Sequence, residues 1–386
     1  MSVGRRGAIR IRRAAGCSAA GGALILMGLL FASAPLFVPG VAFALLGALA
    51  PGWVWLSGLG ATVERRMEQE RVVEDEPLEA TLRLRTGLLR PPGGDVLEPL
   101  AGRVVRLPRG RRSTIRVLAR FDRRGRRQLP PPSLVVRDPL ELAEYARTGS
   151  GPAQDVLVLP RTEAVKWTRN GGEAASTPAS RARADLLAAV EVDGLRPYRL
   201  GTPASRIHWP ALARGAGLLE RRLRVEGDML PLVVLDARGT GPDEHLDTAV
   251  RAAASLTLEL ARTGGCKLLL PGSRRALAVE ADLAFWPAAH ARLALVEGGP
   301  EARAPSPAAL RAALGPLLYV TAQPLERLPA AVGRETRNAS SAVLVLPAAI
   351  APVTDARASF TVSGCRGFVV GARRRDPVSA QRSAAA

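Results

Sequence analysis

Cysteine and histidine are the residues of this chain best suited to nucleophilic or acid–base chemistry, and both are scarce. The only histidines are His208, His245 and His290. Cys266, His290 and Asp282 could form a nucleophile set, in which an imidazole oriented by a carboxylate activates a thiol. Cys266 opens an apolar segment, however, which is typical of a buried and inert thiol. We therefore interpret Cys266 as a core residue.

Motifs that would identify an enzyme class are absent from the sequence. It contains no Gly-x-x-x-x-Gly-Lys-Ser/Thr phosphate loop, no Gly-x-Ser-x-Gly nucleophile turn and no His-Glu-x-x-His zinc motif. The cysteines Cys17, Cys266 and Cys365 have neither zinc-ligand spacing nor the even number of a disulfide framework. We predict that the chain is not an enzyme. The alternative is a hydrolase with an unrecognised site in its α/β domain.

Asp236 ends a short apolar segment, and its position is the one where a metal site is expected. Residues 236–240 read Asp-Ala-Arg-Gly-Thr, which resembles the Asp-x-Ser-x-Ser metal motif of von Willebrand factor A-like domains. Arg238 occupies the first serine position, where its charge would repel magnesium. Thr240 could still supply a hydroxyl, but a hard cation prefers several oxygen ligands. We predict a degenerate site of Asp236 and Thr240 that holds no metal, with magnesium as the ion of a working site.

The elements that would position Asp236 alternate between strands and helices. Continuous apolar runs predict strands that are buried on both faces, and helical spacing separates them. This alternation favours a doubly wound parallel sheet, in which functional groups gather at the carboxyl ends of strands. The predicted strands are 232–235, 267–270, 317–320, 343–346 and 368–370, and the predicted helices are 243–262, which Gly264 and Gly265 end, and 288–295.

Residues 71–146 have a different pattern, with apolar residues at every second position between turn signals. This alternation recurs in 79–85, 102–107 and 113–121, and Pro-Pro-Gly-Gly at 91–94 and Pro-Pro-Pro at 130–132 mark breaks. Short strands at this spacing predict a small antiparallel β-sandwich. The alternative is a disordered linker rich in arginine and proline, which the regular alternation argues against. Residues 168–183 are predicted to form a flexible loop.

The N-terminal region has no charged residue between Ala14 and Val63. A membrane-spanning helix needs about 20 apolar residues, so this window accommodates two helices. We predict them at 16–34 and 41–59, separated by a break at 35–40 that contains two prolines and a glycine. Trp53 and Trp55 would lie at the membrane interface. A cleaved signal peptide is the alternative, but its apolar centre is only about 7–15 residues long.

Charge predicts the orientation of this hairpin and the kind of partner. Five arginines within residues 5–13 should hold the N-terminus on the cytoplasmic side, and two spans then leave residues 64–386 in the cytoplasm. The net charge of +19 also raises the possibility of nucleic-acid binding. The arginines are spread along the chain, whereas phosphate binding needs a clustered basic face. We therefore expect no nucleic-acid partner.

Several segments, taken in order, resemble one bacterial family. They are Asp138-Pro139-Leu140, where the family often has Asp-Pro-Phe-Gly; residues 159–161, Leu-Pro-Arg; and residues 196–218. The last segment is similar to the family pattern Arg-x-Tyr-x-x-Gly-Asp-x-x-(Arg)-x-Ile-x-Trp. With the apolar hairpin, the β-rich region and the strand that ends at Asp236, the chain resembles the family catalogued as "domain of unknown function 58". Thr202 and His208 stand where relatives usually carry aspartate.

This resemblance implies a membrane-anchored protein with a von Willebrand factor A-like C-terminal domain. Family members are often associated with MoxR-type AAA+ ATPases and with transglutaminase-like membrane proteins, and their molecular activity is not established. We accordingly expect a two-pass membrane protein whose cytoplasmic part is a scaffold or adaptor for a protein partner, with a MoxR-type AAA+ ATPase as the leading candidate. We expect no cofactor.

The signature segment is predicted to dock the linker on the α/β domain or to bind the partner. Gly201 with Pro203 fixes a turn. Ile207 and Trp209 alternate with His208, so we expect these two side chains to pack inward from an extended segment. Arg206 and Arg214 could pair with Glu220 or Glu226. The predicted docking or partner-binding residues are Tyr198, Gly201, Arg206, His208, Trp209 and Arg214. The predicted order of regions is a basic N-terminus (1–13), a membrane hairpin (14–63), a β-rich domain (64–150), a linker with the signature (151–229) and the α/β domain (230–386).

Overall fold

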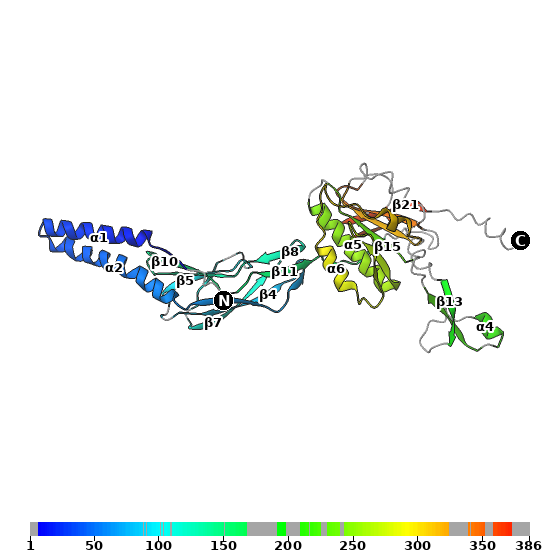
Figure 1. Ribbon diagram of the computed structural model, residues 1–386, viewed down its shortest axis with the longest axis horizontal. Helices are drawn as coiled ribbons and strands as arrows, with labels where there is room; N and C mark the ends of the chain where they lie inside the picture. The colour runs from blue at the N-terminus through cyan, green and yellow to red at the C-terminus, as the bar shows by residue number, and fades with distance from the viewer. Residues whose placement is uncertain are drawn as a thin grey trace. The chain divides into compact units, whose positions relative to one another are not determined.

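The computed structural model describes residues 7–87, 89, 91–100, 102, 104–108, 110–149, 151–167, 191–197, 209–215, 217–224, 230–239, 243–323, 339, 341–351 and 358–372 (Figure 1). The chain forms two compact units. The first comprises Met1–Asp122 and Arg126–Val158, and the second comprises Arg123–Gly125 and Leu159–Ala386. Each unit has a hydrophobic core of its own.

The first unit begins with an apolar helical hairpin, as the uncharged window predicts. Helix α1 (Arg12–Leu30) and helix α2 (Ala34–Gly58) are both long and apolar enough to cross a membrane. Glycines form their contact surface. A Cβ at Gly40 would lie 2.8 Å from the Ile25 nitrogen, and a Cβ at Gly21 would collide with the backbone of Ala44. Small residues let two helix backbones approach closely, which is the usual packing of helices in membranes.

The predicted break of the hairpin at residues 35–40 was wrong. The turn lies at Phe31–Ser33, where Ala32 adopts the left-handed conformation with φ 49°. Pro35 lies in the first turn of α2, where its missing N–H would have had no partner within the helix in any case. Helix α2 continues through Pro39. The proline therefore starts a helix here instead of ending one.

The β-rich part of the first unit consists of three sheets. The strand orders are β1-β10-β9-β5-β6, β2-β4-β7 and β3-β11-β8. The alternation in 79–85 is confirmed, since β4 (Leu78–Arg85) pairs antiparallel with β2 (Thr62–Met67) and β7 (Arg112–Ala119) and buries every second residue. A disordered linker is thereby excluded for this region. The other strands are β1 (Ala8–Arg10), β3 (Arg71–Val73), β5 (Gly93–Leu97), β6 (Val104–Arg106), β8 (Gly125–Leu129), β9 (Ser133–Arg137), β10 (Glu144–Thr148) and β11 (Gln154–Leu159).

The second unit contains an eight-stranded sheet in the order β12-β20-β21-β19-β18-β15-β16-β17. Its central strands, β16 (Cys266–Leu269), β15 (Leu232–Asp236), β18 (Leu317–Thr321) and β19 (Ser341–Pro347), run parallel. The flanking strands are antiparallel, so the predicted parallel arrangement holds for the central strands and not for the edges. The flanking strands are β12 (Lys166–Trp167), β17 (Leu277–Val279), β20 (Phe360–Val362) and β21 (Cys365–Ala372).

A tight turn explains one antiparallel edge. Only Ser363 and Gly364 separate β20 from β21, and their φ values are 45° and 76°. Positive φ at both central residues is the geometry of a two-residue hairpin turn. So short a connection can join only antiparallel strands, because parallel strands need a long crossover.

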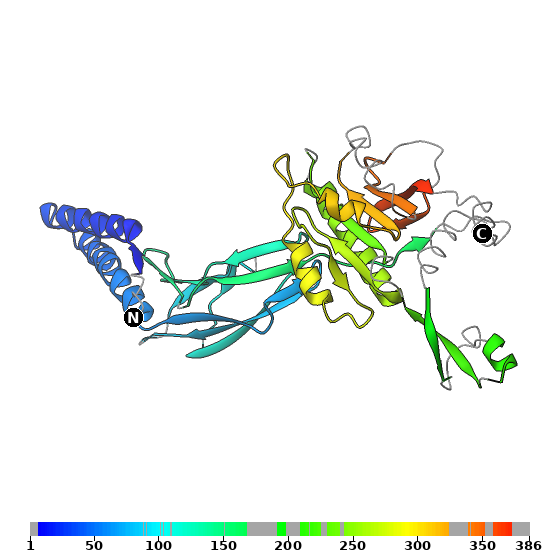
Figure 2. The ribbon, with the colours of Figure 1, turned by 45° about the vertical axis from the view of Figure 1, so that its right-hand side comes forward.

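Helices cover both faces of this sheet (Figures 1 and 2). Helix α5 (Asp243–Gly264) and helix α6 (Trp286–Ala294) share a core with Val233 and Leu235 of β15. Helix α7 (Pro307–Arg311) packs on the opposite face, with Leu232 and Val234. The predicted stop of α5 is confirmed, since Gly265 (φ 101°) donates its N–H to the carbonyls of Leu260 and Ala261.

The signature segment forms a separate element of the second unit. Strands β13 (Glu191–Pro197) and β14 (Leu219–Arg224) pair antiparallel, and the short helix α4 (Trp209–Ala213) lies between them in the chain. The region predicted as a linker therefore contains regular structure on both sides of the signature.

Candidate functional site

The candidate site lies at the carboxyl end of β15, where Asp236 ends the strand. Strand β16 follows β15 in the chain and lies on one side of it, whereas β18 lies on the other side. The strand order therefore reverses at β15. In open α/β sheets, ligands bind in the crevice at such a reversal, outside the carboxyl ends of the strands. Asp236 pairs in register with Thr321, the last residue of β18.

The Asp236 carboxylate is fully buried and accepts four hydrogen bonds. Oδ1 accepts from the Arg238 backbone N–H at 3.1 Å and from Arg238 Nε at 3.0 Å. Oδ2 accepts from Arg238 Nη2 at 2.8 Å and from the Tyr319 hydroxyl at 2.6 Å. The guanidinium thus donates hydrogen bonds to both carboxylate oxygens, and this bidentate geometry is the strongest for an arginine–carboxylate pair.

The contacts with Asp236 also favour the protonated forms of Arg238 and Tyr319. Hydrogen bonding to Asp236 raises the pKa of Arg238, and burial opposes this effect only in part. Burial raises the pKa of Tyr319, and the adjacent Asp236 charge raises it further. The tyrosine consequently stays protonated and acts as a donor. Asp236 and Arg238 thus form a closed ion pair, in which Arg238 and the Tyr319 hydroxyl occupy both carboxylate oxygens.

This arrangement does not fit a magnesium ion. A hard cation needs free oxygen ligands, whereas Asp236 uses both of its oxygens for Arg238 and Tyr319. The Thr321 hydroxyl is also engaged, because it accepts from the Gln323 N–H at 3.1 Å. Thr240 lies outside the described residues. Within the part of the chain that the structure describes, no three histidine, cysteine, aspartate or glutamate side chains are grouped to hold a metal. Arg238 provides the positive charge that a metal would provide at this strand end.

The conceivable nucleophile set is not assembled by the observed contacts. Cys266 is buried and donates to the Thr257 carbonyl at 3.3 Å, and burial raises the pKa of its thiol to about 12. His290 Nε2 lies 2.7 Å from the Pro160 carbonyl oxygen, and the imidazole stacks on Trp286. Asp282 accepts from the backbone N–H of Ala284. The interpretation of Cys266 as a core thiol fits these contacts.

The signature residues are described only in part. Tyr198, Gly201, Arg206 and His208 lie outside the described residues. Trp209 begins α4 and is 56% exposed, and Arg214, just after the helix, is also exposed. Trp209 was expected to pack inward, so its exposure corrects that expectation. Leu212 and Leu218 are exposed beside it in the sequence.

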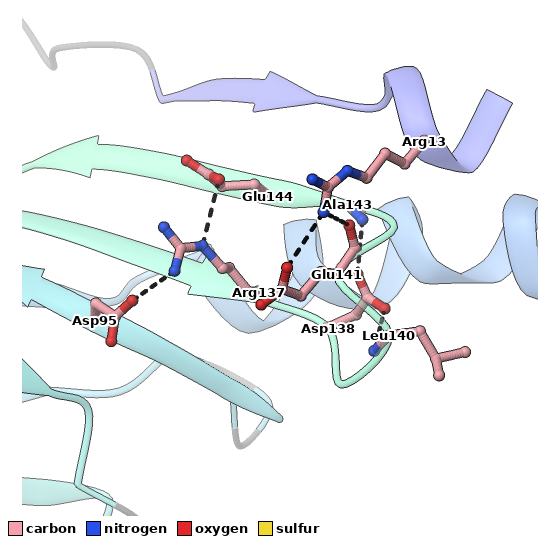
Figure 3. Close-up of polar contacts among 8 residues, drawn as sticks. All are labelled: Arg13, Asp95, Arg137, Asp138, Leu140, Glu141, Ala143 and Glu144. Carbon is pink, nitrogen blue, oxygen red and sulfur yellow. Dashed lines mark hydrogen bonds and ion pairs between the residues drawn. The ribbon is translucent and has the colours of Figure 1, made fainter. Parts of the chain in front are cut away.

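Asp138, the first residue of the Asp138-Pro139-Leu140 segment, organises the loop between β9 and β10 (Figure 3). Its Oδ1 accepts from the Ala143 N–H at 2.6 Å, and its Oδ2 accepts from the Leu140 N–H at 2.9 Å. The loop also contacts the hairpin, since Ala14 of α1 donates its N–H to the Leu142 carbonyl at 3.1 Å. The role of Asp138 in the described contacts is therefore to shape the loop on which α1 begins.

Sequence reasoning missed two polar clusters of the first unit. Arg137 lies between Asp95 at 2.6 Å and Glu144 at 3.3 Å (Figure 3). The side chain of Arg65, in β2, is buried and contacts Glu98 at 2.7 Å. The signal that could have found this pair is the alternation of β2, which turns Arg65 to the same side as the buried Val63.

Comparison with known proteins does not assign the chain to a family. No protein-family model matches this sequence, and no curated protein matches it either. A functional assignment must therefore come from the geometry described above and from the resemblance of the signature segments.

Proposed function

We propose that this protein is anchored in a membrane by its two-helix hairpin, and that residues 64–386 lie in the cytoplasm and serve as an adaptor for a protein partner. The observation that carries the proposal is the packing of the hairpin. Its contact surface is made of glycines, whereas large apolar side chains such as Leu29, Phe31, Val38 and Leu49 are exposed. A helix pair in water buries its large side chains, so this reversed arrangement is suited to lipid.

The charge distribution supports the orientation. Helix α1 begins with Arg12 and Arg13, while α2 contains no charged residue. Arginine flanks favour the cytoplasmic side of a membrane. Two spans return the chain to the side on which it started. A reporter that is active only outside the cytoplasm can be fused after Ala386. Activity of this reporter would overturn the proposed orientation.

The exposed apolar residues of the signature element support a partner-binding role. Trp209, Leu212 and Leu218 leave large apolar side chains in solvent, and tryptophan is enriched among residues that dominate binding energy. We propose that this patch docks the partner. The resemblance to the "domain of unknown function 58" family suggests a MoxR-type AAA+ ATPase as that partner and a von Willebrand factor A-like fold for the second unit.

The proposal assigns no catalytic role to this chain. Asp236 is held in a closed ion pair, and the Cys266 thiol is a poor nucleophile because its pKa is raised. The strand end is then a structural site that fixes β15 relative to β18.

Photo-crosslinking in intact membranes tests the adaptor proposal. A photoreactive residue is placed at Trp209 in one variant and at Phe285, which is similarly exposed, in a matched control. We expect a MoxR-type ATPase to be crosslinked from position 209 and not from position 285. Equal yields from both positions, or no ATPase from position 209, would contradict the assignment of this patch and this partner.

A further inference from the structure

Three arginines gather at the end of the β2-β4-β7 sheet that adjoins helix α2. Strand β2 begins at Thr62, shortly after α2 ends at Gly58. Thr62 pairs in register with Arg85 of β4, and Arg85 pairs with Arg112 of β7. Arg111 immediately precedes Arg112 and is also exposed. We call Arg85, Arg111 and Arg112 the helix-end arginines.

Direct contact confirms that this end of the sheet adjoins the helix end. Gly87 follows β4, and a Cβ at this position would collide with the Leu59 carbonyl oxygen. The same Cβ would lie 2.6 Å from the Ser57 carbonyl oxygen. The segment after β4 therefore packs against the last residues of α2. The Thr86 N–H donates to the Arg111 carbonyl at 3.0 Å, which holds β7 at the same level.

The helix-end arginines have no anionic partner among the described residues. Arg85 and Arg112 are exposed and lie directly opposite each other. Residues in this relation have Cβ atoms about 4.5–5.5 Å apart, and like charges there destabilise the sheet. Some other arginines of this unit are paired, as Arg116 is with Glu79 at 3.5 Å and Arg137 is with Asp95 (Figure 3). An anion from outside the chain would remove the repulsion.

The hairpin indicates the source of that anion. The helices pack antiparallel, since Gly28 near the end of α1 meets Phe37 near the start of α2. Arg12 at the start of α1 therefore lies toward the same end of the hairpin as Gly58. Trp53 and Trp55, near the end of α2, are exposed and suited to the membrane interface. If the hairpin spans the bilayer, lipid headgroups lie at the level of the helix-end arginines.

We propose that the helix-end arginines bind the phosphate of anionic lipid headgroups. This inference rests on the proposed membrane anchoring. Guanidinium groups bind phosphate through paired hydrogen bonds, and a lysine or arginine near an anionic membrane surface contributes about 1 kcal/mol of attraction. The group is confined to one end of the sheet, and Glu64 opposite Arg83 is the next register pair on the same face. Such a small patch beside the helix end suits headgroups better than an extended nucleic acid.

Tryptophan quenching by brominated lipids tests the proposal on the full chain. The protein is reconstituted in phosphatidylcholine vesicles that contain a small fraction of either brominated phosphatidylglycerol or brominated phosphatidylcholine. Trp53 and Trp55 report the lipids around the end of α2. We expect stronger quenching by the brominated phosphatidylglycerol. Each of Arg85→Gln and Arg112→Gln should lower the relative association constant about fivefold, the equivalent of about 1 kcal/mol.

The matched control is the double variant Arg71→Gln/Arg120→Gln. Both residues are exposed, Arg120 follows the far end of β7, and Arg71 begins β3 beyond the far end of β2. This variant removes the same charge as Arg85→Gln/Arg112→Gln and should keep the preference. An equal loss in both double variants would show a net-charge effect and would overturn the proposal.

The remaining outcomes distinguish a failure of the proposed lipid site from a failure of the proposed membrane anchor. Quenching by neither brominated lipid would refute the membrane anchor itself. Equal quenching by both lipids would leave the anchor intact and overturn the lipid site. Inorganic phosphate, added at constant ionic strength, should not abolish the preference. If it does, the arginines form a site for free anions, and the lipid assignment is wrong.

Discussion

Removal of the Arg238 guanidinium should destabilise the second unit, because it leaves the Asp236 carboxylate buried without its counter-charge. In Arg238→Met, Asp236 keeps the backbone N–H of residue 238 and the Tyr319 hydroxyl but loses the bonds from Nε and Nη2. Breaking a buried ion pair costs about 3–5 kcal/mol. The Arg238 side chain is 30% exposed, so water screens the pair and the low end applies. We expect a loss of about 3 kcal/mol, the low end of that range.

Hydrogen exchange of the full chain measures this loss in the unit concerned. A decrease of about 3 kcal/mol in opening free energy corresponds to roughly 150-fold faster exchange. Peptides that cover β15 and β18 should show it. Peptides from β4 should not, because β4 belongs to the first unit and its core is separate. Arg275→Met, which removes an exposed arginine of the same unit, serves as the matched control and should exchange at the rate of the parent protein.

A double variant tests the reason for the loss. Asp236→Asn combined with Arg238→Met removes the buried charge together with its partner, so it should exchange more slowly than Arg238→Met alone. Coupling of this kind is expected only for residues in direct contact. An acceleration of less than about tenfold in Arg238→Met, which is 1.4 kcal/mol, or no recovery in the double variant would show that the ion pair does not stabilise this unit as described.

Three further predictions concern other parts of the chain. Gly21→Leu should separate the helices of the hairpin, because its side chain would meet the Ala44 backbone, whereas Gly22→Leu faces open space and should be tolerated. Crosslinking of cysteines placed across the hairpin distinguishes the two variants, and equal yields would contradict this packing. Burial raises the pKa values of Cys266 and Cys365 to about 12, so neither thiol should react with iodoacetamide at pH 8 until the protein is unfolded. Rapid labelling of either thiol in the folded protein, measured by mass spectrometry, would contradict this burial. Asp138→Ala removes two hydrogen bonds to a charged acceptor and should weaken the β9–β10 loop by about 3 kcal/mol, seen as faster exchange of the loop amides; unchanged exchange there would refute the role of this carboxylate.

Elements whose signal lies in adjacent residues could be predicted before the structure was known. The uncharged window predicted two helices, the alternation in 79–85 predicted β4, and the apolar run 232–235 predicted a buried strand. Gly264 and Gly265 predicted the end of α5. In each case the deciding physics is local, since it depends on side-chain periodicity, on the φ preferences of glycine or on hydropathy over one segment.

Contacts between residues that are distant in the chain became visible only in the folded molecule. The sequence indicated that the charge of Arg238 would repel a metal at this position. It did not show that Arg238 donates hydrogen bonds to both oxygens of Asp236, or that Tyr319, from another strand, donates a further hydrogen bond to the same carboxylate. The antiparallel edges of the sheet, the burial of Arg65 and the register that sets Arg85 opposite Arg112 were likewise invisible. Pairing between strands depends on which backbones meet across long stretches of chain, and burial depends on what covers a residue. Neither quantity is a property of a residue and its immediate neighbours in the sequence.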